Sequence, residues 1–250
     1  MSRIKTVLKT VLRYAGYDIF SVPRGKWQRS GRYFYSEIRP RATLSPWLAD
    51  EDFMCVYQKV MNDTLLDAYR LHELWSLVEQ TSKVKGDIVE IGVWRGGSGC
   101  LMASREKLLG SEGRVHLCDT FCGVVKAGSK DSGYRGGEHH NTSHKAVQDL
   151  ADNLMLKNVC IHAGVFPEAT GREISSAQVR LLHIDVDVYE SAKDSVEFLW
   201  DRIPAGGVIV FDDYGFVGCE GVTAYADEFR RLRGTCFVHN LNGHAIVIKY

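Results

Sequence analysis

Short apolar stretches alternate with amphipathic stretches along the chain after residue 86. The apolar stretches have the length of buried strands, and the segments between them have a helical repeat of apolar residues. The predicted strands are 87–91, 114–118, 158–163, 179–184, 207–211, 236–238 and 245–249. The predicted helices are 97–109, 143–154, 189–200 and 223–233. Alternating strands and helices imply an α/β fold with a parallel sheet that is covered on both faces.

The last two predicted strands are separated only by residues 240–243, which include Asn240 and Gly243. So short a connection favours an antiparallel hairpin. We therefore expect a mostly parallel seven-stranded sheet with an antiparallel strand at one edge.

Residues 50–80 have a helical pattern that ends at Gly86. Leu65, Tyr69 and Leu74 are assigned to apolar faces of this segment, and Arg70 and Glu73 to polar ones. We expect this helical layer to cover the site formed by the sheet. The predicted organisation is a basic N-terminal arm (1–50), a helical cap layer (51–85) and a cofactor-binding catalytic domain (86–250).

Residues 1–41 carry ten Lys and Arg side chains against Asp18 and Glu37. Ile4, Val7 and Leu8 begin an apolar helical repeat with lysines between them. The pattern predicts a basic amphipathic helix. Such a helix either makes peripheral contact with an anionic membrane or packs on the body or a second subunit.

Composition excludes several classes of protein. Lys+Arg and Asp+Glu are equal at 31 each among 250 residues, so nucleic acid is not an expected partner. No apolar run approaches the length of a membrane span, and no signal peptide is visible. The seven cysteines contain no Cys-x-x-Cys pair. We predict a cytoplasmic protein with reduced, mostly buried thiols.

Glycines or acidic residues follow the predicted strands. Ligands of open α/β sheets bind beyond the carboxyl ends of the strands, so these residues are candidate site residues. The first strand runs into Glu90, Gly92 and the segment Gly96–Gly97–Ser98–Gly99, and the second ends at Asp119. The third ends at Gly164, the fourth at Asp185, and the fifth at Asp212 and Asp213. Several carboxylates at one edge repel each other unless a cation or a hydroxyl-rich ligand binds there.

The glycine-rich loop after the first strand lacks the Gly-Lys-Ser/Thr of a phosphate loop. It also lacks the dinucleotide fingerprint, because Trp94 stands where a glycine is needed. Asp119 is placed to accept hydrogen bonds from a ribose diol. A ribose-binding acid without a phosphate loop suits a nucleoside that has no phosphate, and S-adenosylmethionine is such a ligand.

Asp185, Asp212 and Asp213 follow two predicted strands, which we expect to be neighbours. Three carboxylates without a soft ligand favour Mg²⁺, or Mn²⁺ in its place. A metal at this position lowers the pKa of an acceptor hydroxyl, and Asp185 is the candidate base that accepts its proton.

Two other patterns offer alternative chemistry. His139, His140 and His144 lie in or beside the glycine-containing segment 123–141, which we predict to be a mobile lid. One of these histidines could act as a base or contact substrate. Tyr189 and Lys193 form the Y-x-x-x-K pair of short-chain dehydrogenases, with Ser176 thirteen residues upstream, but the glycine loop and the spacing do not fit that class.

Five motifs in order resemble the macrocin O-methyltransferase family (TylF/MycF type) of bacterial natural-product pathways. They are Gly-Val-Trp-Arg-Gly-Gly at 92–97, Cys-Asp-Thr-Phe at 118–121, Gly-Val-Phe-Pro at 164–167, His-Ile-Asp-Val-Asp-Val-Tyr-Glu-Ser at 183–191 and Phe-Asp-Asp-Tyr at 211–214. The similarity begins near Asn62. It does not include the basic arm, and Cys122–Gly123 replaces the usual Glu-Gly of the family.

The resemblance implies a Rossmann-like class I methyltransferase fold with an N-terminal helical extension. It also implies a Mg²⁺-dependent, S-adenosylmethionine-dependent O-methyltransferase of sugar hydroxyls that forms homo-oligomers. The expected metal ligands are Asp185, Asp212 and Asp213, with Asp185 as the base. The expected cofactor-binding residues are Glu90, Gly92, Ser98, Asp119, Thr120 and Gly164.

Two other functions stay open at this point. A methyltransferase of the same fold could act on a catechol-like phenol instead of a sugar. A domain without enzymatic activity could bind a nucleoside, with the basic arm attaching it to a membrane or partner.

Overall fold

The computed structural model describes residues 28–36, 38 and 42–250. The chain divides into two compact units, Met1–Glu37 and Ile38–Tyr250. The described part of the first unit is an antiparallel hairpin of β1 (Gln28–Ser30) and β2 (Tyr33–Tyr35). The amphipathic helix predicted near residues 4–12 lies outside the described residues.

The helical pattern at 50–80 is two helices, α2 (Glu51–Val60) and α3 (Ala68–Thr81), preceded by the short 3₁₀ helix η1 (Pro46–Leu48). Aspartates cap both helices, because the side chain of Asp50 accepts from Phe53 N and that of Asp67 from Tyr69 N and Arg70 N. Asp50 also accepts from Trp75 Nε1 at 3.0 Å. This shared carboxylate ties the start of α2 to α3.

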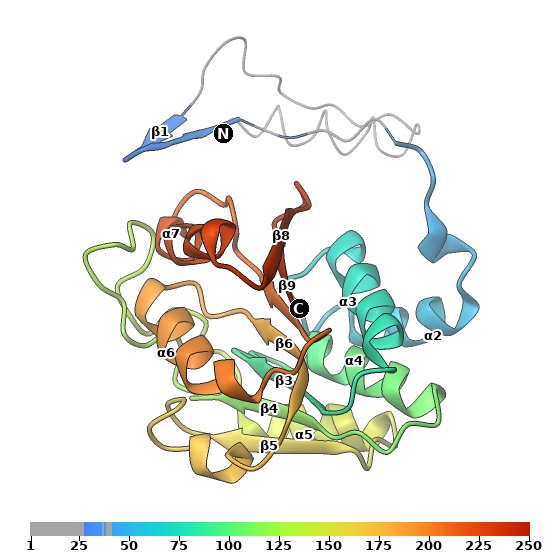
Figure 1. The fold of residues 1–250 in the computed structure, drawn as a ribbon. Coiled ribbons are helices and arrows are strands. Elements are labelled where there is room, and N and C mark those ends of the chain that lie inside the picture. The colour runs from blue at the N-terminus through green and yellow to red at the C-terminus, as the bar shows by residue number, and fades with distance from the viewer. Residues whose placement is uncertain (1–27, 37, 39–41) are drawn as a thin grey trace, which may run out of the picture. The chain divides into compact units, whose positions relative to one another are not determined.

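The larger unit is built on a seven-stranded sheet with the order β5-β4-β3-β6-β7-β9-β8 (Figure 1). Its strands are β3 (Asp87–Ile91), β4 (Val115–Asp119), β5 (Val159–Ala163), β6 (Val179–Ile184), β7 (Val208–Phe211), β8 (Thr235–His239) and β9 (Ala245–Lys249). The helices between them are α4 (Gly97–Leu108), α5 (His144–Asn153), η2 (Gly171–Ile174), α6 (Tyr189–Leu199), η3 (Trp200–Arg202), α7 (Glu220–Ala226) and η4 (Asp227–Arg231).

Strands β3 to β7 are parallel, and β8 and β9 form the predicted antiparallel hairpin. The reversed strand, β9, pairs with β7, so β8 is the outermost strand on that side. The helix predicted at 223–233 begins earlier, at Glu220, and continues as a 3₁₀ helix from Asp227.

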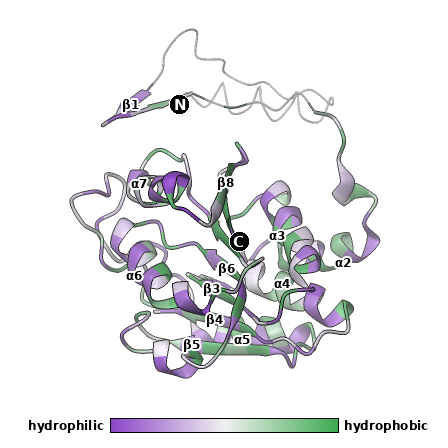
Figure 2. Ribbon diagram, in the orientation of Figure 1, coloured by the Kyte–Doolittle hydropathy of each residue, from purple (hydrophilic) through white to green (hydrophobic). Residues whose placement is uncertain are grey.

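Two apolar layers cover the sheet. One contains α2 to α5 and the side chains of alternate strand residues such as Ile88, Leu181 and Val210. The other contains α6 and α7 and the intervening strand residues, such as Val89 and Leu182. Figure 2 shows central strands that are largely hydrophobic and helices that carry both colours. The predicted α/β architecture with helices on both faces is confirmed.

Neutralising the buried carboxyl group of Glu106 should destabilise the fold strongly. Arg180 on β6 and Glu106 on α4 form an ion pair in which both side chains are almost fully buried. Glu106→Gln leaves the guanidinium without its counter-charge, so we expect a loss of about 3–5 kcal/mol in the free energy of unfolding. Chemical denaturation measures this loss.

The matched control is Glu79→Gln, which removes the carboxylate that pairs with Arg105. The Glu79 side chain is more than half exposed, so the same substitution there should change the free energy of unfolding by less than about 1 kcal/mol. Equal losses in the two variants would contradict this account of the Arg180–Glu106 pair.

No helix among the described residues is long and apolar enough to cross a membrane. All seven cysteines are free thiols. The prediction that most are buried is wrong, since only Cys100, Cys118 and Cys219 are buried.

Candidate functional site

The glycine loop after β3 lies against the end of β6. Gly92 has φ +85°, and a Cβ at this position would come within 1.7 Å of the backbone oxygen of Asp185. Gly96, the N-cap of α4, also has a left-handed conformation, with φ +90°. Glycine is therefore required at Gly92 both for its conformation and for the close approach of two backbones.

Asp119 ties this loop to the end of β4. Its Oδ2 accepts from Val93 N at 2.7 Å and Trp94 N at 2.9 Å, and its Oδ1 accepts from Phe121 N at 2.6 Å. A carboxylate has about four acceptor sites, so these three bonds leave capacity for one more donor. Asp119 thus shapes the loop and still presents an acceptor at the sheet edge.

Three aspartates converge at the ends of β6 and β7. One carboxylate oxygen from each of Asp185, Asp212 and Asp213 lies within 4.8 Å of the others. Burial, followed by the neighbouring carboxylates, raises the pKa values of Asp185 and Asp213 well above their usual range. The three carboxyl groups are close enough to bind one ion together. A divalent cation bound between them would stabilise their ionised forms.

Asp212 differs because it has cationic partners. Arg70 Nη1 donates to both of its oxygens, at 2.8 and 2.6 Å, and His244 Nε2 lies 3.0 Å from Oδ1. Burial alone would raise the pKa of Asp212, but His244 and Arg70 outweigh it and lower the pKa to about 2. Asp212 is therefore held as an anion in the absence of a ligand.

The glycine loop and the aspartates border one cavity of about 350 Å³. Five of the six residues expected to bind the cofactor line it, namely Gly92, Ser98, Asp119, Thr120 and Gly164. All three expected metal ligands also line it. The cap layer contributes the segment 64–66 and Arg70. Residues predicted from separate motifs therefore share one cavity.

Glu90 is the exception among the expected cofactor residues. It is fully buried and does not line the cavity. Alternation along β3 turns its side chain to the face that α4 covers, where Oε1 accepts from His183 Nδ1 at 2.9 Å. The register explains this contact, since Glu90 and His183 are directly paired across β3 and β6.

Segment 123–141 contributes Gly123, Val124, Val125, Tyr134 and His139 to the cavity. Asp131 fixes this segment to the start of α6, because its buried carboxylate accepts from Tyr189 N and Gly128 N. His140 and His144 do not line the cavity. Of the three histidines, His139 alone is placed to meet a ligand there.

Sequence reasoning missed Arg70 and Asp187. The helical pattern predicts Arg70 on a polar face, but it is 8% exposed, and it precedes the buried Leu74 by one helical turn. That spacing could have revealed its burial. Conversely, the pattern predicts Leu65 and Tyr69 on apolar faces, but both are exposed. Asp187 lies in the motif at 183–191 and has no role predicted from the sequence, yet it lines the cavity beside Tyr134.

Tyr189 does not support a dehydrogenase site. Its hydroxyl donates to Glu228 Oε1 at 3.1 Å, its ring packs against Tyr225, and it does not line the cavity. The Y-x-x-x-K pair therefore belongs to the start of α6, where the Tyr189 side chain contacts residues of α7 and η4.

Comparison with known proteins gives the family. Residues 56–241 match the family described as Macrocin-O-methyltransferase (TylF). The chain belongs to the macrocin O-methyltransferase family. This match confirms the resemblance found in the sequence.

Two curated relatives of this macrocin O-methyltransferase family member are O-methyltransferases by name. A Streptomyces olivaceus protein named 8-demethyl-8-(2,3-dimethoxy-alpha-L-rhamnosyl)-tetracenomycin-C 4'-O-methyltransferase is 30% identical over 168 residues, or 62% of this chain and 64% of the relative. Demethyldecarbamoylnovobiocin O-methyltransferase from Streptomyces niveus is 28% identical over 180 residues, or 67% of each chain. The alignments thus span about two thirds of these relatives.

Solved structures agree with the fold of the family member. The O-methyltransferase NovP has a TM-score of 0.65 and 24% identity, over 75% of this chain and 82% of that chain. The calicheamicin methyltransferase CalS11 has a TM-score of 0.62 and 16% identity, over 89% and 99%. These similarities confirm the predicted Rossmann-like class I methyltransferase fold.

The raised pKa values of Asp185 and Asp213 predict how the stability of the metal-free protein depends on pH. Both folded-state pKa values exceed the unfolded value of about 3.9, so the folded protein binds more protons. Their stabilising contribution is therefore complete below about pH 4 and is lost as pH rises through the folded-state values. Asp212 acts oppositely, because its contribution is lost only as pH falls toward 2.

Thermal melts of chelator-treated protein between pH 5 and 8 measure this effect. Asp213→Asn should flatten the decline in Tm with rising pH, because asparagine does not titrate. A variant with the same pH profile as the wild-type protein would show that Asp213 is not a source of the decline.

Proposed function

We propose that this protein is an S-adenosylmethionine-dependent O-methyltransferase that methylates a hydroxyl of a sugar or glycosylated small molecule. We further propose that Asp185, Asp212 and Asp213 hold a Mg²⁺ or Mn²⁺ ion. The observation that carries the proposal is the convergence of these three carboxylates on the cavity that the glycine loop and Asp119 also line. Family membership and the names of the curated relatives support the reaction and the acceptor class.

The cofactor would occupy the side of the cavity formed by the glycine loop. Gly92 and Ser98 give backbone and hydroxyl contacts there, Asp119 and Thr120 offer acceptors to the ribose, and Gly164 leaves space at the end of β5. When bound, S-adenosylmethionine supplies a methyl group on a positively charged sulfur. The cavity suits that charge, because its lining includes five aspartates and one arginine.

The acceptor hydroxyl would lie near the three aspartates. A bound Mg²⁺ or Mn²⁺ would supply positive charge that favours deprotonation of the hydroxyl. Asp185, at the end of β6, accepts the proton as the general base. The other side chains position the acceptor and exclude water, which is the main contribution that a protein makes to such a transfer.

Segments 51–85 and 123–141 would cover the reacting groups. Leu65, Phe216 and Val217 add apolar surface to the cavity lining. That surface suits an acceptor with an apolar part beside its sugar. Self-association, and contact of residues 1–41 with a membrane, stay predictions from the sequence.

Methyl transfer from isotopically labelled S-adenosylmethionine tests this proposal. The acceptors would be a panel of glycosides, their aglycones and simple catechols, with Mg²⁺ present or removed by chelation. We expect transfer to glycosides alone, and loss of transfer on chelation. Transfer to catechols alone would favour the phenol alternative, and cofactor binding without transfer to any acceptor would favour a nucleoside-binding module.

A further inference from the structure

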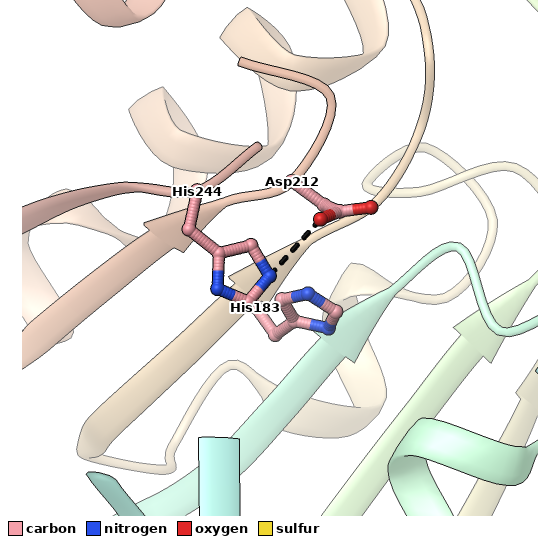
Figure 3. Close-up of side chains that lie close together, drawn as sticks. All are labelled: His183, Asp212 and His244. Carbon is pink, nitrogen blue, oxygen red and sulfur yellow. Dashed lines mark ion pairs between the residues drawn. The ribbon is translucent and has the colours of Figure 1, made fainter. Parts of the chain in front are cut away.

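A second group of potential metal ligands lies on the sheet face beneath α3 and α4. It consists of His183, His244 and Asp212, whose ligand atoms lie within 4.8 Å of one another (Figure 3). His183 and His244 are fully buried, and Asp212 is 2% exposed. Strand register brings Asp212 and His244 together, because they adjoin Phe211 and Ala245, which are paired across β7 and β9.

A glutamate carboxylate bonds to the Nδ1 atom of each imidazole. His183 Nδ1 bonds to Glu90 Oε1 at 2.9 Å, and His244 Nδ1 bonds to Glu73 Oε2. Glu73 is itself fixed by Asn242 Nδ2, which donates to Oε2 at 3.1 Å. Metal-bound histidines almost always donate the other ring nitrogen to a carboxylate or carbonyl in this way. Both imidazoles therefore have the support that metal ligands have.

The two Nε2 atoms are left for Asp212 or a cation. His244 Nε2 lies 3.0 Å from Asp212 Oδ1, but His183 Nε2, although fully buried, has no hydrogen-bond partner among the residues that the structure describes. When Nδ1 of His183 carries the proton and donates it to Glu90, Nε2 has a lone pair that accepts no hydrogen bond from any described residue. A buried acceptor without a partner costs about 1–3 kcal/mol, so this atom is the strongest sign that something binds here.

The charges around the group also favour a cation. Glu73, Glu90 and Asp212 are carboxylates, and Arg70 contributes one permanent positive charge through Asp212. Even with His244 protonated between Glu73 and Asp212, three carboxylates face two positive charges. A divalent cation that replaced this proton would offset the remaining negative charge of the buried cluster.

We propose that His183, His244 and Asp212 form a second metal site, for an imidazole-preferring divalent cation such as Zn²⁺. Two histidines and one carboxylate form a donor set of zinc, whereas Mg²⁺ prefers oxygen ligands alone. The proposed function does not require this site. The two sites share Asp212, so the expected competition between their metals rests on the proposed Mg²⁺ site. Zn²⁺ at the histidines should therefore weaken Mn²⁺ binding at the aspartates.

Cobalt titration of the chelator-treated protein tests this site, because four-coordinate Co²⁺ with nitrogen ligands absorbs visible light far more strongly than Co²⁺ with six oxygen ligands. Asp185→Asn serves as the parent protein, since it removes a ligand of the proposed Mg²⁺ site only. We expect strong absorption at one equivalent of Co²⁺, displaced by Zn²⁺ and not by Mg²⁺.

In that parent, His183→Asn and His244→Asn should each weaken Co²⁺ binding by at least a hundredfold. Glu90→Gln keeps all three ligands and should weaken binding by about 10–100-fold, so it tests the site even if a histidine variant fails to fold. His162→Asn is the matched control, because His162 is a buried histidine of β5 that contacts His116 instead. It should leave Co²⁺ binding unchanged.

Absence of strong absorption in the Asp185→Asn parent would overturn the inference, as would unchanged Co²⁺ binding in Glu90→Gln and in folded histidine variants. These outcomes are independent of the proposed function, whose failure would appear instead as the absence of methyl transfer by the wild-type protein.

Discussion

Asp185→Asn should lower kcat/KM for methyl transfer by about a thousandfold, within the range typical of the loss of a general base. The amide cannot accept the proton of the acceptor hydroxyl, and it is a poor ligand for a hard cation. The affinity for S-adenosylmethionine should stay within about threefold, less than 1 kcal/mol. Steady-state kinetics and calorimetric titration of the cofactor measure the two effects separately.

The control for this prediction is Asp149→Asn, which removes an exposed carboxylate of α5 that pairs with Lys145. It should leave both kcat/KM and cofactor affinity unchanged. A fall in cofactor affinity as large as the fall in kcat/KM of Asp185→Asn would contradict the assignment, because Asp185 would then act in cofactor binding and not in proton transfer.

Gly92→Ala should destabilise the protein by about 4 kcal/mol or more, which is exceptional for a single substitution. The added Cβ would lie 1.7 Å from the backbone oxygen of Asp185, and no side-chain rotation can relieve a clash between two backbones. The left-handed φ of +85° adds conformational strain. The loop and the end of β6 must separate, so S-adenosylmethionine binding should be lost as well. Chemical denaturation and cofactor titration measure these losses.

Gly110→Ala separates the steric clash from the conformational strain. Gly110 also has a positive φ, +66°, but a Cβ there would meet no atom within 4 Å. This variant should therefore lose only about 1–2 kcal/mol. Similar losses at the two positions would show that the contact between Gly92 and Asp185 is not as tight as the structure has it.

The fold could be predicted because each of its strands and helices is encoded by a local pattern of apolar residues that repeats along the chain. Each strand is a short apolar run between turn residues, so the strands, their parallel arrangement and the final hairpin all follow from the pattern. The pairing order was harder to obtain. That β9 lies between β7 and β8 depends on packing between distant segments, and the pattern around residues 235–249 is compatible with either order.

The cavity residues at strand ends could also be predicted, because chain direction in a parallel sheet brings those ends to one edge. Gly92, Asp119 and Asp185 are examples. The partners of these residues could not. Arg70 reaches Asp212 across 142 positions of sequence, and only the docking of α3 on the sheet decides whether this arginine meets solvent or a buried aspartate.

Glu90 shows a different limit of sequence reasoning. Glu90 stands two residues before Gly92, and the family resemblance implies that it binds the cofactor. In the structure, strand alternation turns its side chain toward His183 and not into the cavity. Proximity in a motif does not decide the face of the sheet on which a side chain lies.

Binding of Mn²⁺ to the chelator-treated protein, with S-adenosylmethionine present, tests whether Asp185, Asp212 and Asp213 hold a divalent cation beside the cofactor. Free Mn²⁺ would be followed by electron paramagnetic resonance in the wild-type protein and in Asp185→Asn/Asp213→Asn. We expect one bound Mn²⁺ per wild-type chain, and binding at least about a hundredfold weaker in the double variant, which should still bind the cofactor. A wild-type protein that binds the cofactor but leaves all Mn²⁺ free, or a double variant that binds Mn²⁺ as tightly, would contradict this expectation.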